Sequence, residues 1–252
     1  MSISIDRLET AMQRRLDALP KVLRPFTTAK RGLPRAFLVT GRRGVGKTTF
    51  LLHHSRGKGM LYLSPDNPLL GDRSLYDTVH KIFMKGFSGV IVDEVHFARD
   101  WSLPLKALYD DFPKHAIWAS DSSALVLRSG TADLSRRYIP IRKTLLSFRE
   151  FIKLKTGEDH PVFDPFKEIK VKGDPQILSL FRDYRRYGTR PFFEEGNFRD
   201  RMMGILKKSL YADIPFFIPR ITEGNLRLMN AMIATLAKSP IPRLQVRSLC
   251  AD

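Results

Sequence analysis

The chain has 252 residues, of which 43% are hydrophobic, so it is long enough to bury a substantial core in one large domain or two small ones. The single cysteine, Cys250, excludes an internal disulfide framework. The sequence shows no signal peptide and no apolar segment long enough to span a bilayer, so we expect a soluble cytoplasmic protein with no membrane partner. Lys and Arg total 43 against 26 Asp and Glu, and the net charge of +17 favours a polyanionic partner such as a nucleotide, DNA or RNA, although a solvated basic surface explains it equally well.

Residues 1–34 form an N-terminal arm ahead of the first motif. Apolar residues recur at helical spacing from Ile5 to Leu19, which predicts an amphipathic helix that ends before Pro20. A short basic segment follows and leads into the next element. We interpret the arm as packing material with a charged surface, and contact between its basic residues and phosphates as the less favoured alternative.

An apolar run from Ala36 to Val39 predicts a buried strand, and Gly41–Thr48 then matches G-x-x-x-x-G-K-[ST] without a mismatch. Glycines let successive N–H groups point at phosphate oxygens, and the helix that begins near Lys47 adds the positive end of its dipole. We expect Lys47 to reach the β- and γ-phosphates of a nucleotide and the Thr48 hydroxyl to bind Mg²⁺. The predicted nucleotide-binding residues are Gly41, Arg42, Arg43, Gly44, Val45, Gly46, Lys47, Thr48 and Thr49. A glycine-rich turn that matches by chance is the alternative.

Two further strands are predicted at residues 59–64 and 89–92, with a helix between them. The second of these runs directly into Asp93 and Glu94, and an apolar strand ending in an acidic pair downstream of a phosphate loop is the Walker B arrangement. We expect Asp93 to hold Mg²⁺ through water and Glu94 to orient and deprotonate the attacking water. A solvated acidic turn is the alternative.

The next predicted elements are a helix capped by Ser102 and a fourth strand at residues 116–119. Polar residues follow that strand, and a polar group at the end of a strand between the two Walker strands lies beside the γ-phosphate. We therefore name Ser120 as the candidate γ-phosphate sensor, with Asp121 second. Alternatively, these residues only cap the following segment, residues 125–135, which we expect to be helical or looped.

An arginine pair, Arg136 and Arg137, precedes a short fifth strand predicted at residues 138–141. An arginine at this place can neutralise charge that develops on a transferred phosphoryl group, in its own subunit or in a neighbouring one. A solvated basic pair is an equally good interpretation.

Taken in order, these motifs resemble a known family, the prokaryotic AAA+-like ATPases, in which a truncated AAA module is often followed by a helical and winged-helix region. The stretches that carry the resemblance are GRRGVGKTTFLL (41–52), VIVDEVHFARDW (90–101), IWASDSSALVL (117–127), LSRRYIPI (134–141) and LLSFREFIKL (145–154), with weaker support from YRRYGTRPFF (184–193) and ADIPFF (212–217).

The resemblance implies an α/β fold with a three-layer αβα P-loop core, a parallel sheet in the order 5-1-4-3-2, and ATP with Mg²⁺ as ligands. It also implies that Arg137 is an arginine finger, which can act across the interface of a homo-oligomer. Asp121 and Arg136 stand where glycine is common in the family. The departures leave open the sensor assignment and the choice between Arg136 and Arg137.

We divide the chain into the arm (1–34), an AAA+-like core (35–155) and a helical C-terminal region (156–252). The helices predicted in the last region lie at residues 177–187, 198–210 and 226–236, and residues 244–250 are interpreted as either the opening of a winged helix or part of a helical lid. Its densest basic cluster is Arg182, Arg185, Arg186 and Arg190, for which phosphate binding and a solvated helix face are both open. The six histidines lack the spacing of a zinc site, and we interpret them as structural or surface residues.

The leading hypothesis is a Mg²⁺-dependent ATP hydrolase whose nucleotide state moves the helical C-terminal part. The residues expected to be catalytic are Glu94, Lys47, Ser120 and Arg137, with Thr48 and Asp93 at the metal. We prefer ATP to GTP because no N-K-x-D-type guanine reader is present. The alternative is an ATP-binding switch that binds nucleic acid with negligible turnover, and a third hypothesis is an assembly protein in which Arg137 completes a neighbour's site.

Overall fold

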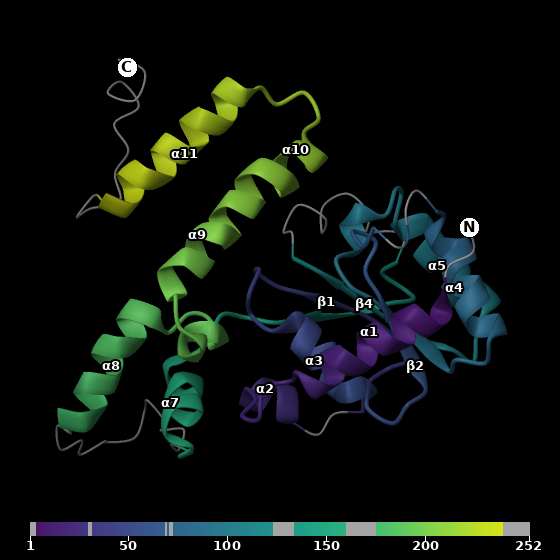
Figure 1. The fold of residues 1–252 in the computed structure, drawn as a ribbon, viewed down its shortest axis with the longest axis horizontal. Coiled ribbons are helices and arrows are strands. Elements are labelled where there is room, and N and C mark those ends of the chain that lie inside the picture. The colour runs from purple at the N-terminus through teal and green to yellow at the C-terminus, as the bar shows by residue number, and fades with distance from the viewer. Residues whose placement is uncertain are drawn as a thin grey trace. The chain divides into compact units, whose positions relative to one another are not determined.

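The computed structural model describes residues 4–29, 32–68, 70, 73–122, 134–159 and 175–238. The chain divides into two compact units, Met1–Gly196 and Asn197–Asp252 (Figure 1). Each unit is described by itself below. The segments predicted at residues 125–135 and 244–250 lie mostly or wholly outside the described residues.

The first unit is built on a five-stranded sheet in the order β2-β3-β4-β1-β5, in which every neighbouring pair is parallel. The strands are β1 (Ala36–Thr40), β2 (Met60–Leu63), β3 (Gly89–Val92), β4 (Ala116–Asp121) and β5 (Ile139–Arg142). This confirms the predicted order 5-1-4-3-2. All strands therefore end at the same edge of the sheet, which we call the carboxyl edge.

Helices cover the sheet and complete the predicted αβα core. The helical elements of this core and its arm are α1 (Ile5–Asp17), α2 (Pro25–Thr28), α3 (Lys47–Ser55), α4 (Leu75–Met84), η1 (Val95–Phe97) and α5 (Ser102–Asp111). The amphipathic α1 buries Leu8 and Met12 and packs against β2, as its spacing predicts. The prediction that Ser102 caps its helix is wrong, because the buried Trp101 occupies the N-cap position and Ser102 is the first helical residue.

The interior of the sheet explains why its central strands are almost wholly apolar. Strands β1 and β3 are buried along their whole length, as expected for a parallel sheet covered on both faces. The Phe37 ring lies 5.0 Å from Trp118 and 6.3 Å from Phe50, centroid to centroid. Strand β5 is mostly exposed and contains Pro140, which an edge strand tolerates because no ladder bond is lost on the open side.

Three more helical elements belong to the first unit: α7 (Phe148–Thr156), α8 (Pro175–Tyr187) and η2 (Pro191–Glu195). Ser147 and Glu150 form a capping box at the start of α7. A small apolar cluster of Leu146, Phe151 and Leu154 packs against Tyr184 and Phe193, which come from α8 and η2. The compact unit therefore continues past residue 155, where we predicted the end of the core, to Gly196.

The second unit is a chain of helices with little buried surface. It contains α9 (Phe198–Lys208), η3 (Ser209–Asp213), α10 (Ile214–Phe217) and α11 (Glu223–Lys238). Leu210 and Leu226 are buried, whereas Met203, Phe216 and Leu228 are exposed. Two of these helices, α9 and α11, match the predicted ones within a few residues.

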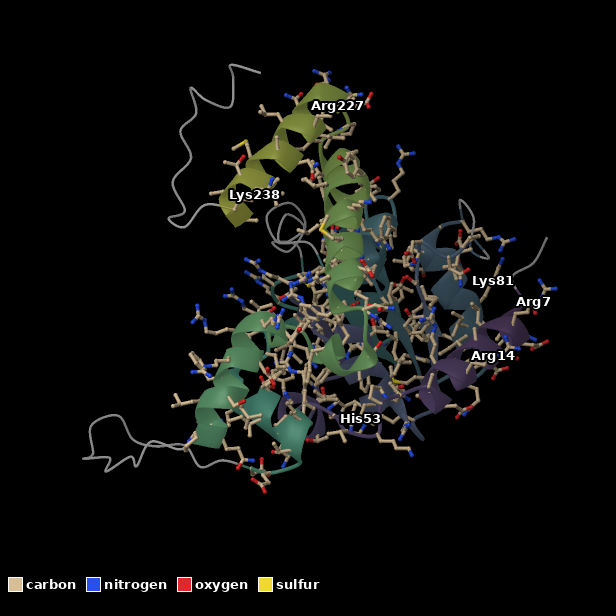
Figure 2. All side chains as sticks on the ribbon, turned by 60° about the vertical axis from the view of Figure 1, so that its left-hand side comes forward. Arg7, Arg14, His53, Lys81, Arg227 and Lys238 are labelled. Atoms are coloured by element: carbon tan, nitrogen blue, oxygen red, sulfur yellow. The ribbon has the colours of Figure 1, made fainter. Side chains whose placement is uncertain are left out.

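The surface of the described chain is strongly basic. Arg7 and Arg14 on α1 and Lys81 on α4 point outward from the first unit, as Figure 2 shows. Among the described residues, no helix is both long and apolar enough to cross a lipid bilayer.

Candidate active site

The loop between β1 and α3 has a shape that only glycine permits at two positions. Gly41 has φ +155°, and a Cβ there would lie 2.2 Å from the Lys143 carbonyl oxygen. Gly46 has φ +89° and is the N-cap residue of α3, which begins at Lys47. The first N–H groups of a helix have no carbonyl partner within the helix, so this loop and helix end can bind an anion.

The loop is held in place by residues from distant parts of the chain. Arg24, buried in the arm, donates from Nη1 to the Val45 carbonyl at 2.9 Å and forms a two-point ion pair with Glu150 at 3.0 and 2.8 Å. Arg190 donates from Nε to the Arg43 carbonyl at 2.8 Å. In sequence, Arg24 belongs to the short basic segment of the arm, whose pattern predicts a charged surface. Its role depends on contacts across more than a hundred residues, which no local pattern reveals.

Two of these bracing groups have shifted pKa values. Burial alone would raise the pKa of Glu150, but hydrogen bonds from Arg24 and Ser147 outweigh it, so the pKa lies below its ordinary value. Burial, with the charge of Arg42 as a second cause, lowers the pKa of Arg190. The charges that brace the loop are thus partly withdrawn from water.

Lys47 lies over the loop with its ammonium group almost fully buried. Its Nζ donates to the Gly41 carbonyl at 2.9 Å and to the Ser122 hydroxyl at 2.7 Å. Burial lowers the pKa of Lys47, although three nearby carboxylates act in the opposite direction. The ammonium group is therefore positioned where phosphate oxygens beside the loop would meet it.

Thr48 and Asp93 are in direct contact, with Thr48 Oγ1 donating to Asp93 Oδ2 at 2.6 Å. Asp93 Oδ2 also accepts from the Tyr62 hydroxyl at 2.9 Å, and Oδ1 accepts from the Ser120 hydroxyl. Mg²⁺ prefers hard oxygen ligands of these kinds and is held by few protein groups. The residues present therefore fit Mg²⁺.

The two serines at the end of β4 have different surroundings. Ser120 is fully buried and bonded to Asp93, whereas Ser122 lies between Lys47 Nζ and Glu94 Oε1, accepting from the first and donating to the second. Strand β4 extends through Asp121, in register with β1, rather than ending at residue 119 as predicted. Ser120 thus lies within the sheet, and Ser122 is the first polar side chain beyond it.

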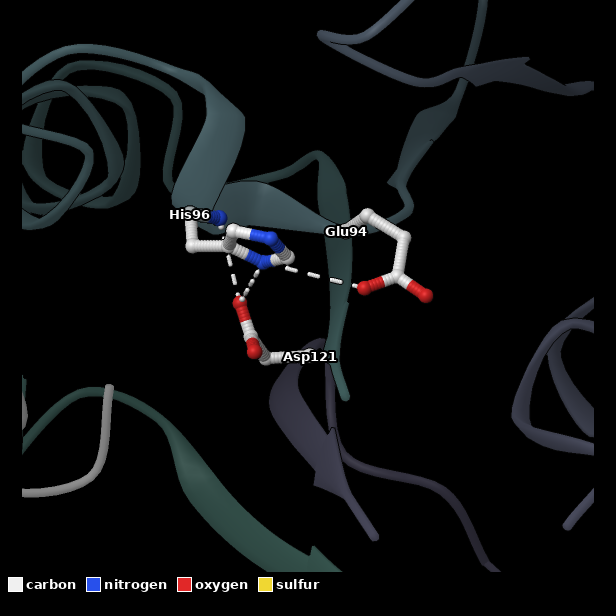
Figure 3. Close-up of side chains that lie close together, drawn as sticks. All are labelled: Glu94, His96 and Asp121. Carbon is white, nitrogen blue, oxygen red and sulfur yellow. Dashed lines mark hydrogen bonds and ion pairs between the residues drawn. The ribbon is translucent and has the colours of Figure 1, made fainter. Parts of the chain in front are cut away.

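Glu94 is part of a second group of polar side chains, shown in Figure 3. His96 is fully buried, and its Nδ1 lies 2.9 Å from Asp121 Oδ2 and 3.7 Å from Glu94 Oε2. The backbone N–H of His96 also donates to Asp121 Oδ2 at 3.1 Å. Glu94 itself has φ +52°, a left-handed conformation that is uncommon for a residue with a side chain.

The ligand atoms of Glu94, His96 and Asp121 all lie within 4.8 Å of one another, which is close enough for a metal. Asp121 Oδ2 contacts His96 through both its ring and its backbone, and Glu94 Oε2 lies beyond hydrogen-bond distance of that ring. The spacing of the histidines predicts only structural or surface roles. The pairing of His96 with Asp121 depends on η1 and the end of β4 lying side by side.

Residues 33–152 match a family model described as an AAA domain. This part of the chain is identified as an AAA domain. The uncharacterized protein MJ1637 of Methanocaldococcus jannaschii is 31% identical over 210 residues, which cover 70% of this chain and 43% of that protein. The chain therefore spans less than half the length of this curated relative.

Among solved structures, a RuvB variant from Thermotoga maritima aligns with a TM-score of 0.44 and 14% identity, over 99% of this chain and 81% of that chain. At this level of likeness it adds nothing to the topology that the strand pairing already defines.

The arginine pair of the AAA domain lies at the opposite edge of the sheet. Arg137 makes a two-point ion pair with Asp110, at 2.9 and 2.8 Å, and its hydrogen bond lowers the pKa of that carboxyl. It precedes the amino end of β5, whereas the phosphate loop follows the carboxyl end of the parallel β1. The four residues of β5 separate the two edges by roughly 10 Å or more. Arg136, next to it, is exposed.

The structure thus gathers most of the predicted site residues at the carboxyl edge and leaves the arginine pair elsewhere. The predicted residues that converge there are Lys47, Thr48, Asp93, Glu94 and Ser120. The residues that sequence reasoning did not single out are Arg24, Tyr62, His96, Ser122 and, as a loop brace, Arg190.

Proposed function

We propose that the AAA domain binds Mg²⁺–ATP and hydrolyses it. The observation that carries the proposal is the convergence of Lys47, the Thr48–Asp93 pair and Glu94 beside a glycine-shaped loop at the carboxyl edge. Lys47 and the amides of the loop bind the β- and γ-phosphates, and Thr48 and Asp93 hold the metal. Mg²⁺ held by these residues would supply positive charge to offset the charge of the phosphate oxygens.

Glu94 is the general base in this proposal. Its carboxylate accepts a proton from the attacking water, while the Ser122 hydroxyl donates to Oε1 and the His96 ring lies 3.7 Å from Oε2. Ser122 connects Glu94 to Lys47, so a phosphate that draws the ammonium group away also frees the serine hydroxyl. We therefore assign the sensing of the γ-phosphate to Ser122, and to Ser120 the support of Asp93.

Coupling of nucleotide state to the helical C-terminal part would begin at Arg190. This residue lies between α8 and η2 and bonds the Arg43 carbonyl inside the phosphate loop. A loop that shifts when phosphate binds must therefore pull on the segment that joins these two helices. The contact lies wholly within the first compact unit.

The arginine finger would act only in trans. Arg137 lies across the sheet from the phosphate loop of its own subunit, so it can reach a nucleotide only in a neighbouring copy. We call the edge at which the strands begin the amino edge. The position of Arg137 supports a homo-oligomer in which the amino edge of one AAA domain faces the carboxyl edge of the next.

The experiment that tests the proposal compares wild type with Lys47→Ala and Glu94→Gln. We expect Lys47→Ala to lose binding of a fluorescent ATP analogue, and Glu94→Gln to bind it but release phosphate roughly 10²- to 10⁴-fold more slowly. Lys81→Ala and Glu9→Gln, which change exposed charges by the same amount, are the controls. Equal phosphate release in wild type and Glu94→Gln would overturn the proposal that the domain hydrolyses ATP. The preference for ATP would be overturned if GTP displaced the fluorescent analogue as well as ATP does.

A second candidate function, binding of nucleic acid, is favoured by one observation. Arg182, Arg185 and Arg186 are all exposed on α8, at a spacing that places them on one side of the helix. Changing all three to Gln should lower the slope of log affinity against log salt by about three for labelled DNA or RNA. The control changes Arg7, Arg14 and Lys81 to Gln. A salt response that is the same for both triple variants contradicts this function.

A further inference from the structure

Tyr62, on β2, is a buried residue whose hydroxyl reaches into the proposed metal site. It donates to Asp93 Oδ2 at 2.9 Å, and the same oxygen accepts from Thr48 at 2.6 Å. The Ser120 hydroxyl occupies the other carboxylate oxygen. Three hydroxyl groups from three different elements therefore determine how the Asp93 carboxylate is rotated.

The Tyr62 hydroxyl can act only as a donor in this place. A carboxylate oxygen has no proton to donate, so the hydrogen bond runs from the Tyr62 hydroxyl to Asp93 Oδ2. The ring is only 7% exposed, so water has little access to replace the hydroxyl if it is removed. Without this donor, Asp93 Oδ2 keeps the hydrogen bond from Thr48 and Oδ1 keeps the one from Ser120, so one of the three contacts that orient the carboxylate is lost.

The N-terminal helix supports the tyrosine from its other side. The Arg15 guanidinium of α1 lies over the Tyr62 ring, 4.8 Å from its centroid, which is within the range of a cation–π contact. Helix α1 packs on β2, and Arg56, just after α3, donates to the Leu16 carbonyl at 3.0 Å. The arm is thus connected to Asp93 through one side chain.

We propose that Tyr62 is a positioning residue for the metal: its hydroxyl, backed by Arg15, holds the Asp93 carboxylate in the orientation in which it and Thr48 receive Mg²⁺ together. This inference rests on the proposed function, because it assumes that Asp93 and Thr48 hold Mg²⁺. It extends the site to an edge strand and to the arm, and the sequence pattern of the arm predicted only packing. Groups that orient metal ligands typically change metal affinity by 10- to 100-fold when removed.

The test uses Tyr62→Phe, with Tyr138→Phe as the matched control. Both tyrosines are buried, and the Tyr138 hydroxyl also makes one hydrogen bond, to the Leu105 carbonyl at 2.9 Å. Binding of a fluorescent ATP analogue is titrated at a series of Mg²⁺ concentrations and in excess EDTA. Mg²⁺ should strengthen binding of the analogue, and we expect the Mg²⁺ concentration that gives half of this gain in affinity to rise about tenfold in Tyr62→Phe. Binding in EDTA should be unchanged, and Tyr138→Phe should match wild type in both.

A second pair of variants tests the same link without touching the core. Arg15→Gln should shift the Mg²⁺ dependence in the same direction by a smaller factor, whereas Arg14→Gln, an exposed neighbour with the same charge, should not. If Tyr62→Phe and Tyr138→Phe show the same Mg²⁺ dependence, or if Tyr62→Phe weakens binding equally in EDTA, the inference is overturned while the proposed function stands. If wild type binds the analogue no better with Mg²⁺ than without it, both are overturned.

Discussion

The two edges of the same sheet carry charged residues in very different surroundings. At the carboxyl edge, Lys47, Asp93 and His96 are buried and are held by contacts from several elements. At the amino edge, Arg137 and Asp110 form an ion pair whose side chains are 26% and 45% exposed. Both edges contain residues that nucleotide chemistry would use, and at the carboxyl edge several of them converge within one chain.

The difference shows what each edge can do. Electrostatic interactions are stronger where water is excluded, so the buried carboxyl edge can hold a highly charged ligand in a defined geometry. An exposed ion pair contributes little stability and is easily exchanged for another partner. The amino edge is therefore suited to meet a second molecule, whereas the carboxyl edge is suited to chemistry.

The largest expected effect comes from removing the arginine at the amino edge, which tests whether this edge takes part in hydrolysis. Arg137→Ala should lower phosphate release by about 10³-fold if the arginine stabilises the transferring phosphate of a neighbour. Mixing this variant with Glu94→Gln should restore activity, because one kind of interface then pairs an intact base with an intact arginine. Phosphate release measured at several protein concentrations checks both points.

Arg136→Ala is the matched control, since Arg136 is the exposed neighbour in the same turn. Loss of activity in Arg136→Ala but not in Arg137→Ala would identify the other arginine as the finger. Full activity in both would show that the amino edge takes no part in hydrolysis.

The second effect concerns how much the Arg24 contacts at the carboxyl edge contribute to the stability of the fold. Arg24→Met removes the hydrogen bond to the Val45 carbonyl and leaves Glu150 without its ion partner. We expect the free energy of unfolding to fall by about 3 kcal/mol, as for other broken buried pairs. Denaturant unfolding monitored by circular dichroism measures it, with Arg7→Met as an exposed control. A change no larger than that of the control would mean that the brace contributes nothing.

A smaller effect separates the two serines at the end of β4. Ser122→Ala should lower kcat about tenfold with little change in the binding of ATP, because one hydrogen bond of about 1.4 kcal/mol is lost during the reaction. Ser55→Ala, which removes a buried hydroxyl bonded to the Leu52 carbonyl, is the control. If Ser120→Ala lowers kcat at unchanged Mg²⁺ dependence while Ser122→Ala does not, the original assignment of the sensor to Ser120 is correct.

The smallest effect is a pH dependence of stability. The pKa of Glu150 is lower in the folded chain than its ordinary value, so its ionised form favours folding. This contribution is fully present above the ordinary pKa, near 4.5, and is lost as the pH falls through the lower folded value. The difference in unfolding free energy between wild type and Glu150→Gln should therefore shrink below about pH 4.5. A difference that stays constant from neutral pH into this acidic range contradicts the assignment.

Local pattern was enough to predict the strands, the phosphate loop and the acidic pair. The glycines at 41 and 46 are required by the loop itself, and the apolar runs of β1 and β3 follow from a sheet covered on both faces. Because parallel strands end at one edge, the order of motifs along the chain also predicted that Lys47, Asp93 and Glu94 would meet there.

Only the tertiary structure decided which side chains complete that site. The extension of β4 by its register with β1 placed Ser120 inside the sheet and Ser122 beyond it. The packing of α1 on β2 brought Arg15 to Tyr62, and the fold of the arm brought Arg24 to the loop. These contacts join residues that are far apart in sequence. The spacing of residues within one helix or strand does not reveal which side chain of another element they will contact.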